Sequence, residues 1–405
     1  MDASEIRRRV QHAVARHAAV PEMVRGVAVP YQRRGEMSIP AFKMKPGGDP
    51  RVDGRDASLK LMGKAQQLPV DFFFFDCEDA APDHPEFKAH ARQFAVEALR
   101  SMDFGTRVVG FRPNNIRTAH FEEDLITAVG EAGDRLAALV IPKTETADEV
   151  KDIAGLVEDI QRLHRRDNRI MLEVLIESPR ALLEAEKIAA IPAVAALVLG
   201  SWDFARTLGG RVAADSWLMD QAVVRQTLPI LAAAHGKDAV DAITGTLPLR
   251  PAAPPGVEVA LVNAALLADP ETLDVGVLGQ AFVDGVRRHQ HALALARRDA
   301  QDARRLGFAA KWILHPDQIE PIQAAWTPSR QEALDALKLA ADYASAALVG
   351  SGATLRGQQL TDKAVVGAEW WLVEAALRAN VLVASDVAAT GHTLAALRRT
   401  VKTRD

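Results

Sequence analysis

The 405-residue chain contains a single cysteine, Cys77. One thiol excludes an intramolecular disulfide, which fits a protein of the reducing cytoplasm. The first residues, Met1 to Arg7, hold no apolar core of a signal peptide. No apolar stretch approaches the ~20 residues that a membrane-spanning helix needs. We therefore expect a cytoplasmic protein that makes no membrane contact.

A strong charge of either sign is also absent. The chain has 49 Lys and Arg residues against 53 Asp and Glu residues, a formal net charge of −4. Such a chain has no strong field with which to hold nucleic acid, so we expect a small-molecule substrate. The sequence also lacks a glycine-rich phosphate loop and the CxxC and HExxH motifs. Apolar residues are abundant, at 48% of the chain, and allow a sizeable core.

Short apolar runs alternate with helix-like segments along most of the chain. We expect eight strands, at 38–43, 72–76, 107–112, 137–142, 170–176, 195–200, 239–244 and 311–315. The helix-like segments include 86–99, 146–162, 181–189 and 219–234. Alternating strands and helices predict a parallel sheet, and eight units predict a closed (β/α)8 TIM barrel. The runs at 72–75 and 137–141 are apolar throughout, as a sheet covered on both faces requires.

Three regions are expected from this pattern. An N-terminal helical arm covers 1–33, with a helix at 4–26, and the barrel covers 34–325 with an insertion at about 245–280. Within the insertion, the proline-rich stretch 247–256 cannot be a helix or an inner strand. A C-terminal helical lid and tail covers 326–405, with helices at 330–348 and 360–379 and a glycine-containing hinge at 350–353.

Charged and polar residues follow most of the predicted strands. They are Asp76, Glu78, Asp79, Arg112, Asn114, Lys143, Glu177, Asp203, Asp241 and His315. In a parallel barrel these strand ends open onto one shared mouth, where catalysis is sited. Carboxylates converging there would bind a hard divalent cation. The cation, together with Arg112, would bind a carboxylate and a developing oxyanion.

Each of these residues also has a structural interpretation. An acid at the start of a helix, such as Asp203, can serve only as a cap or dipole partner. Glu177 has less need of that role, because Ser178 already offers a cap. Lys143 can simply pair with Glu145 or Asp79, and His315 can belong to a packed turn before Pro316. The joint placement of these residues at one end of one barrel supports the functional interpretation.

Several segments match a known family in order, from about residue 70 to about residue 365. They are FDCEDA at 75–80 with Lys88 and Arg92, RPN at 112–114, IPK at 141–143, IESPRAL at 176–182, GSWDF at 200–204, LGFAAKWILHPDQI at 306–319 and QLTD at 359–362. This pattern resembles the citrate lyase β-chain and malyl-CoA lyase family of the HpcH/HpaI aldolase group. It is closest to malyl-CoA lyase.

The resemblance implies a site built around Mg²⁺, with Mn²⁺ as the alternative. Glu177 and Asp203 would hold the cation, and Arg112 would bind the substrate carbonyl or thioester oxygen. Glu78 and Asp79 would orient Arg112 or metal-bound water. Asp362, from a partner subunit, would be the acid/base, so a homo-oligomer, a trimer or a hexamer, is expected. The apolar stretch 370–373 would contribute to subunit contact.

Further residues would bind substrate. Lys143, Asp76 and His315 lie at strand ends, and Lys43 and Lys45 would meet the CoA phosphates. The family usually opens with a V-P-G-like turn, whereas this chain has Pro40 to Met44 there, so CoA binding stays an open expectation.

The implied reaction is reversible carbon–carbon cleavage of a 3-hydroxyacyl-CoA, such as malyl-CoA or citryl-CoA, into an α-keto acid and an acyl-CoA. Three alternatives remain. They are a thioesterase on malyl-CoA-like esters, an aldolase on free hydroxy-keto acids, and a subunit of a lyase complex that is inactive alone.

Overall fold

The computed structural model describes residues 33–212, 221–356 and 359–401. These residues fall into two compact units, one within 27–327 and one that includes 328–401. The helix expected at 4–26 lies outside the described residues. Within them, no helix combines the length and apolar character needed to cross a membrane.

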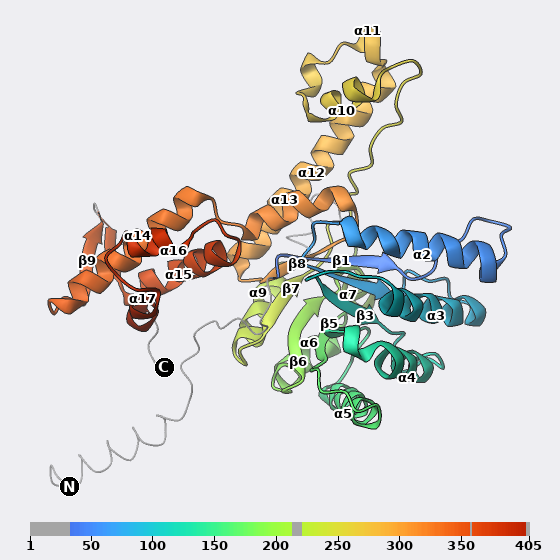
Figure 1. Ribbon diagram of the computed structural model, residues 1–405, viewed down its shortest axis with the longest axis horizontal. Coiled ribbons are helices and arrows are strands. Elements are labelled where there is room, and N and C mark those ends of the chain that lie inside the picture. Colours follow the sequence, from blue (N-terminus) through green and yellow to red (C-terminus); the bar gives the residue numbers. More distant parts are fainter. Residues whose placement is uncertain (1–32, 213–220, 357–358, 402–405) are drawn as a thin grey trace. The chain divides into compact units, whose positions relative to one another are not determined.

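The first unit contains the predicted TIM barrel (Figure 1). All eight strands are parallel, and β8 pairs with β1 to close the ring. The strands are β1 (Gly35–Pro40), β2 (Phe72–Asp76), β3 (Val108–Arg112), β4 (Ala138–Ile141), β5 (Met171–Ile176), β6 (Val194–Leu199), β7 (Asp238–Asp241) and β8 (Ala310–Ile313). The expected first strand began three residues too late, so Lys43 lies beyond β1 rather than within it.

Helices surround the barrel and alternate with its strands (Figure 1). They are α2 (Arg55–Gly63), α3 (Pro85–Ser101), α4 (Phe121–Ala132), α5 (Ala147–Leu163), α6 (Pro179–Ala189), α7 (Ser201–Leu208), α9 (Ala222–Ala233), α12 (Gln280–Leu306) and α13 (Ile319–Gln323). Local signals set several of these starts. Ser178, for example, caps α6 by accepting from the Ala181 N–H at 3.0 Å, and Pro179 follows at the first helical position.

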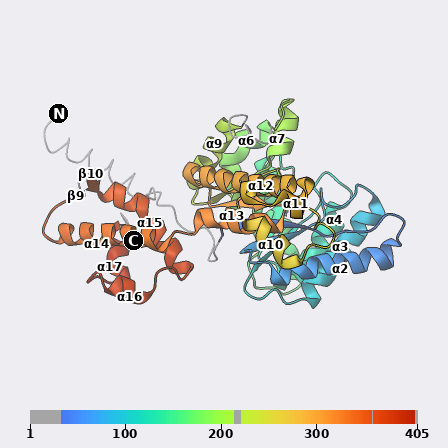
Figure 2. The same ribbon diagram turned by 90° about the horizontal axis from the view of Figure 1, so that it is seen from above.

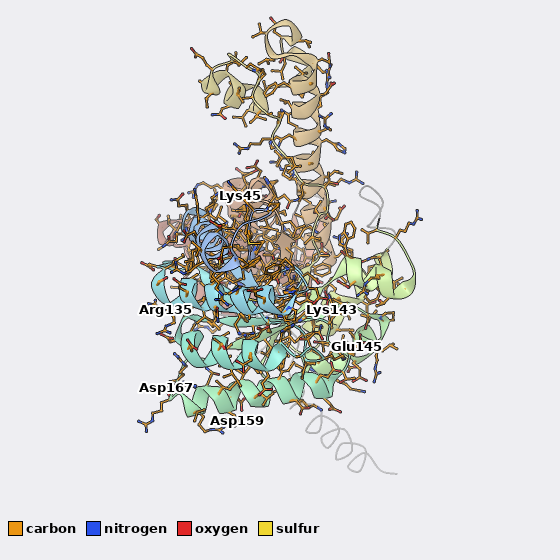
Figure 3. All side chains as sticks on the ribbon, turned by 90° about the vertical axis from the view of Figure 1, so that its right-hand side faces the viewer. Lys45, Arg135, Lys143, Glu145, Asp159 and Asp167 are labelled. Atoms are coloured by element: carbon orange, nitrogen blue, oxygen red, sulfur yellow. The ribbon has the colours of Figure 1, made fainter. Side chains whose placement is uncertain are left out.

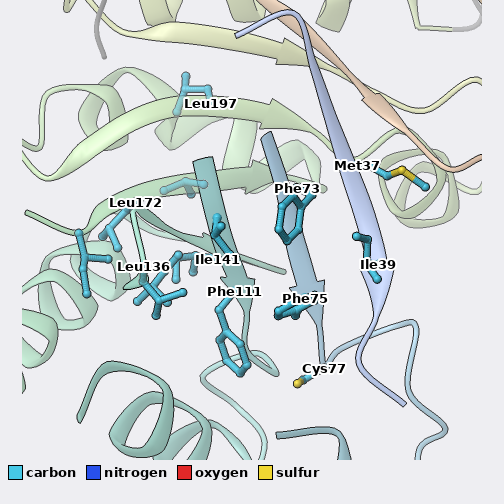
Figure 4. Packing of buried hydrophobic residues seen from close by; sticks show 14 of the residues in the cluster. Met37, Ile39, Phe73, Phe75, Cys77, Phe111, Leu136, Ile141, Leu172 and Leu197 are labelled. Carbon is cyan, nitrogen blue, oxygen red and sulfur yellow. The ribbon is translucent and has the colours of Figure 1, made fainter. Parts of the chain in front are cut away.

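The run of four phenylalanines explains how the barrel is filled on both faces. Side chains alternate along a strand, so Phe72 and Phe74 join the cluster inside the barrel. Phe73 and Phe75 join the larger cluster between strands and helices (Figure 4). All four side chains are fully buried. A continuously apolar strand is therefore required here, as the sequence predicted.

The chain between β7 and α12 contains two helices that the sequence did not predict. The stretch 247–256 has no regular structure, as expected, but α10 (Val259–Leu267) and α11 (Val275–Leu278) follow it. Both pack on the beginning of α12 (Figures 1 and 2). Their contact is a separate small cluster that includes Val262, Leu266, Leu278, Phe282 and Val283.

The second unit is helical with one β-hairpin. It contains α14 (Arg330–Leu348), β9 (Ala353–Arg356), β10 (Gln359–Asp362), α15 (Lys363–Arg378), α16 (Ala384–Ala388) and α17 (Leu394–Val401). The helix expected from residue 360 was placed too early. Residues 359–362 pair instead with β9, Leu360 opposite Leu355, and the Asp362 carboxylate then caps α15 by accepting from Val365 N at 3.0 Å.

The apolar stretch 370–373 is covered within this unit. Trp370, Leu372 and Val373 are buried in a core with Leu337 and Leu397. The sequence had suggested contact with a partner subunit as the reason for this stretch. Its own unit already provides the cover, so the stretch no longer argues for oligomerisation.

Candidate active site

The carboxyl ends of the strands open on a cavity of about 330 Å³. Its lining includes five of the charged residues that the sequence placed at the mouth: Asp76, Asp79, Arg112, Glu177 and Asp203. Ligands bind at this end of parallel barrels because the strand ends and the loops that follow them converge there. The cavity is therefore the candidate active site.

Arg112 is clamped by Asp76 through a bidentate ion pair. The two residues are direct neighbours in the β2–β3 register, with Nε to Oδ1 at 2.7 Å and Nη2 to Oδ2 at 2.5 Å. The guanidinium also lies 5.5 Å from the centre of the Trp312 ring. Burial by itself would lower the pKa of Arg112, but Asp76, with smaller contributions from Glu78 and Asp79, raises that pKa. Asp76 therefore orients the arginine.

Lys143 connects three carboxylates across the mouth. Its Nζ lies 2.9 Å from Glu78, 3.2 Å from Asp79 and 3.5 Å from Asp203. Its backbone has a φ of 50°, in the left-handed region that favours glycine. Of the two expected partners, Asp79 is in contact and belongs to a wider ion network, whereas the Glu145 carboxylate accepts from Ser178 Oγ instead. Arg112 extends that network, with Nη1 3.5 Å from Glu78.

A buried lysine holds the acidic loop in place. Lys88 Nζ donates to the carbonyl oxygens of Cys77 at 3.1 Å and Glu78 at 2.5 Å. Cys77 itself is fully buried, as expected for a small apolar filler. The loop that carries Glu78 and Asp79 is therefore positioned from behind by α3.

Glu177 is a buried carboxylate that caps no helix. Its Oε2 accepts from the Lys143 backbone N–H at 2.7 Å, while Ser178 caps α6. Burial raises the pKa of Glu177 to about 7, against the lowering effect of Lys143 and Arg112. The side chain fits only because residue 200 is glycine. A Cβ atom added at Gly200 would stand 2.2 Å from Glu177 Cγ.

Asp203 lies in the first turn of α7 and lines the same cavity as Glu177. Its carboxylate accepts from Arg206 Nε at 3.1 Å, and the nearby Asp203 charge contributes to the raised pKa of Glu177. Two neighbouring carboxylates on a cavity large enough for water fit a hard divalent cation. Among the described residues, no cluster of three or more acidic, His or Cys side chains forms a fuller cage. Water or substrate would therefore complete the coordination.

The beginning of α7 adds polar groups that the sequence reasoning missed. Ser201 Oγ is buried on the cavity and has no hydrogen-bond partner in the described structure. The first backbone N–H groups of a helix are also left without helical partners and favour anions. Ser201 lies in the GSWDF segment, of which only the acid at position 203 was predicted to belong to the site. Ser38, Trp202, Ile243 and Trp312 were missed in the same way.

Some predicted site residues lie elsewhere. His315 Nδ1 accepts from the Asp317 backbone N–H at 3.2 Å and caps a short 3-10 turn, Pro316–Gln318. Lys43 and Lys45 are exposed beyond β1, and Figure 3 shows Lys45 well apart from Lys143. Asp362 belongs to the second unit.

Asp241 does not face the cavity. It pairs with Arg225 of α9 at 2.6 Å and with Lys311 of β8 at 2.8 Å, between the barrel and its helices. The expected seventh strand ran to residue 244, whereas β7 ends at Asp241. The late position of Asp241 in its strand therefore says nothing about catalysis.

Comparison with known proteins gives consistent results. The HpcH/HpaI aldolase/citrate lyase family model matches residues 55–246. An L-malyl-CoA/β-methylmalyl-CoA lyase of Cereibacter sphaeroides is 27% identical over 332 residues, 80% of this chain and 95% of the relative. A (3S)-malyl-CoA thioesterase of the same species is 29% identical over 318 residues, 78% of this chain and 90% of the relative.

Two solved structures share the fold. A citrate lyase from Burkholderia xenovorans superposes with a TM-score of 0.65 at 20% identity, covering 90% of this chain and 97% of that one. CitE of Mycobacterium tuberculosis, in complex with magnesium, acetoacetate and coenzyme A, gives 0.55 at 22% identity, covering 86% and 98%. The matched region contains Glu78, Arg112, Lys143, Glu177 and Asp203, so the resemblance read from the motifs is confirmed. This chain is therefore similar, over most of its length, to carbon–carbon lyases of the HpcH/HpaI aldolase/citrate lyase family.

Proposed function

We propose that the chain is a Mg²⁺-dependent lyase that cleaves a 3-hydroxyacyl-CoA, such as malyl-CoA or citryl-CoA, into an α-keto acid and an acyl-CoA. The observation that carries the proposal is that Arg112, Glu177 and Asp203 line one cavity at the mouth of the barrel. In this arrangement Glu177 and Asp203 would hold a cation for the α-keto acid, and Arg112 would offer a fixed positive charge to the acyl-CoA.

The α-keto acid would lie on the side of β5 and β6. Glu177 and Asp203 would hold Mg²⁺, or Mn²⁺ in its place, and the bound cation would polarise the carbonyl oxygen of the keto acid. Ser201 Oγ and the first N–H groups of α7 would bind its carboxylate. Magnesium in the complex of M. tuberculosis CitE supports this assignment.

The acyl-CoA would lie on the side of Arg112. The bond that breaks joins the hydroxyl-bearing carbon to the carbon next to the thioester carbonyl. Its electron pair passes to the thioester side and leaves an enolate. The Arg112 guanidinium would stabilise the enolate oxygen, and Asp76 keeps it aimed there. Lys143 offsets the charge of Glu78 and Asp79. These groups lower the barrier because they are fixed before the charge develops.

Proton transfer needs one further group. The hydroxyl proton must leave during cleavage and the enolate carbon must gain a proton. We assign both transfers to Asp362 of a partner subunit, which makes the active enzyme a homo-oligomer. Mixing Asp362→Asn with Arg112→Gln subunits tests the assignment. Each variant alone should be inactive, and the mixture should recover activity if the two groups come from different subunits.

Two exposed lysines would serve CoA. Lys43 and Lys45 lie in the loop after β1, where their ammonium groups could meet its phosphates. The CoA in the M. tuberculosis CitE complex supports a CoA ester as the substrate.

Keto-acid release tests the proposed function directly. Protein and Mg²⁺ are mixed with malyl-CoA, methylmalyl-CoA and citryl-CoA, and with the matching free acids. The released keto acid is trapped as its phenylhydrazone. Turnover of a thioester supports the proposal, turnover of free acids alone supports an aldolase, and no keto acid from the whole panel contradicts it.

A thioesterase is the second candidate, because the thioesterase relative is 29% identical to this chain. Arg112 would then stabilise the oxyanion formed when water attacks the thioester. A free thiol would appear without any keto acid, so a thiol reagent in the same assay separates the two reactions.

A further inference from the structure

The charged and apolar side chains of the cavity come from different arcs of the barrel. The charged ones follow β2, β3, β5 and β6. A set that we call the apolar wall consists of Pro40, Trp202, Ile243, Trp312 and Leu314. Four of its members lie on or just after β7, β8 and β1, which are neighbours in the closed ring. The wall is therefore continuous.

Trp202 is more exposed than Leu314, the other exposed member of this wall. Its side chain is 53% exposed, although it sits between Ser201 and Asp203, both of which line the cavity. The indole rests on Gly245, where an added Cβ atom would stand 2.9 Å from Trp202 Cζ2. A large aromatic surface left open at a cavity mouth is a surface for a ligand to cover.

The backbone beneath the indole is fixed. Gln318 Nε2 donates to the carbonyl oxygens of Thr244 at 3.0 Å and Thr246 at 3.3 Å. A little further on, His289 Nδ1 hydrogen-bonds to Pro248 O at 2.8 Å. The Gly245 backbone, and the ring that rests on it, are therefore positioned before any ligand arrives. Because these side chains are already ordered, ligand binding would cost little conformational entropy.

The proposed function, on which this inference rests, places a particular part of the substrate against the wall. The thioester oxygen would lie at Arg112, 5.5 Å from the Trp312 ring, and the keto acid at Asp203 and Ser201, beside Trp202. The carbon that joins the two products lies between them. An alkyl group on that carbon would therefore face the indoles of Trp202 and Trp312. An acetyl unit has no such group and would leave the apolar wall exposed to water.

We propose that Trp202, supported by Gly245, is the specificity-determining residue for the acyl group. The site takes thioesters whose reacting carbon bears an alkyl group of ethyl size or larger in preference to acetyl. Burial of each CH₂ group is expected to raise kcat/KM about fourfold. Butyryl-CoA should therefore exceed acetyl-CoA by roughly 15-fold for two CH₂ groups.

The test is an acyl-length series in the synthetic direction. Glyoxylate and Mg²⁺ are combined with acetyl-, propionyl- or butyryl-CoA, and the condensation product is measured by liquid chromatography. Binding of the same thioesters is measured separately by calorimetry. Trp202→Ala should bring the butyryl-to-acetyl ratio close to one in both measurements. Trp202→Phe should retain most of the preference, and Gly245→Ala should change it by displacing the indole.

Leu208→Ala is the matched control. Leu208 lies on the same short helix, is 60% exposed and does not line the cavity, so its variant should keep the wild-type ratio. Products formed with equal efficiency from acetyl- and butyryl-CoA would overturn the inference and leave the proposed function intact. So would a preference that survives in Trp202→Ala.

Failure of the proposed lyase activity would give a different result from failure of the specificity inference. If no thioester gives a condensation product, the proposed lyase activity is wrong. A butyryl preference in binding that disappears in Trp202→Ala would then still support the wall, and equal binding of all three thioesters would overturn it.

Discussion

Two groups of charged side chains differ in their balance of acids and bases. One group lies around β7 and β8, and the other lies near the carboxyl ends of β2 to β6. The first, the closed network, lies between the barrel and its helices and consists of Arg225, Asp241, Asp299 and Lys311. Among the described residues, two cations face two carboxylates, and the four side chains are at most 6% exposed. The charges of these four residues balance one another.

The second, the open cluster, faces the cavity and has more acids than bases. It consists of Asp76, Glu78, Asp79, Glu177 and Asp203 with Arg112 and Lys143. With Arg206, which pairs with Asp203 at the exposed edge, five carboxylates thus face three cations. The pKa of Glu177 is raised to about 7, chiefly by burial. The difference separates charge that stabilises the fold from charge held ready for a ligand.

The largest expected effect is on the closed network. Lys311→Met removes one cation and leaves Arg225 to face both Asp241 and Asp299. Breaking a buried ion set costs about 3–5 kcal/mol in the free energy of unfolding, measured by urea denaturation. Adding Asp299→Asn should recover part of the loss, because the charges then balance again. A loss under about 1 kcal/mol would show that the network contributes little, on the scale of an exposed pair.

Arg112→Lys tests the open cluster through activity. Lysine keeps the charge but cannot form the bidentate pair with Asp76 or the same planar stack on Trp312. We expect kcat for keto-acid release to fall by about 10²–10³-fold, as when an oxyanion-stabilising donor is removed. Arg100→Lys, at an exposed pair with Glu131, is the control and should keep full activity. A fall of less than tenfold would argue against the assigned role of Arg112.

Glu177→Gln should have opposite effects on stability and on ion binding. The raised pKa means that the folded, ion-free chain loses stability as pH rises from about 4.5 to about 7, since the unfolded chain gives up its proton first. Above pH 7 the variant should be more stable than the wild type by about 1–3 kcal/mol. The variant has no carboxyl group at position 177, so this source of pH dependence should be missing from its free energy of unfolding between about pH 4.5 and 7.

Ion binding supplies the second readout for the same variant. Titration of Mg²⁺ by calorimetry should give an affinity at least about tenfold weaker in Glu177→Gln, and weaker in the wild type below pH 7. Removing Mg²⁺ with a chelator should abolish keto-acid release. Unchanged Mg²⁺ affinity would contradict the metal assignment.

The smallest effect is expected at an exposed ion pair. Asp159 and Arg162 pair at 2.7 Å on α5, and Figure 3 shows Asp159 at the outer edge of the molecule. Both side chains are more than two-thirds exposed. Asp159→Ala should change the free energy of unfolding, obtained from thermal denaturation, by no more than the ~0.5 kcal/mol typical of such pairs. A larger change would weaken the contrast between buried and exposed charge.

The barrel could be predicted because its strands are short, largely apolar and separated by helix-like segments. Buried parallel strands leave that pattern whatever the loops contain. The β9–β10 hairpin was missed because Leu360 and Thr361 continue into the apolar pattern of α15 without a break. The helices α10 and α11 were missed because the prolines before them indicate only where regular structure stops.

The site was predictable only in part. Acids after strands are visible in a sequence, and Glu177 and Asp203 do line one cavity. Which way a side chain points at a strand end depends on where the strand stops, so Asp241 was placed on the wrong side of the barrel wall. Uncharged lining residues such as Trp202 and Ser201 resemble ordinary core or cap residues until the cavity is seen.

Lys143 has a backbone conformation that glycine would adopt without strain. A non-glycine residue at φ 50° costs of order 1 kcal/mol. In return, its N–H reaches Glu177 while its ammonium reaches the acids after β2. One strained residue thus couples the half of the mouth assigned to the keto acid with the half assigned to the thioester. A shift of the loop after β4 would therefore displace groups in both halves together.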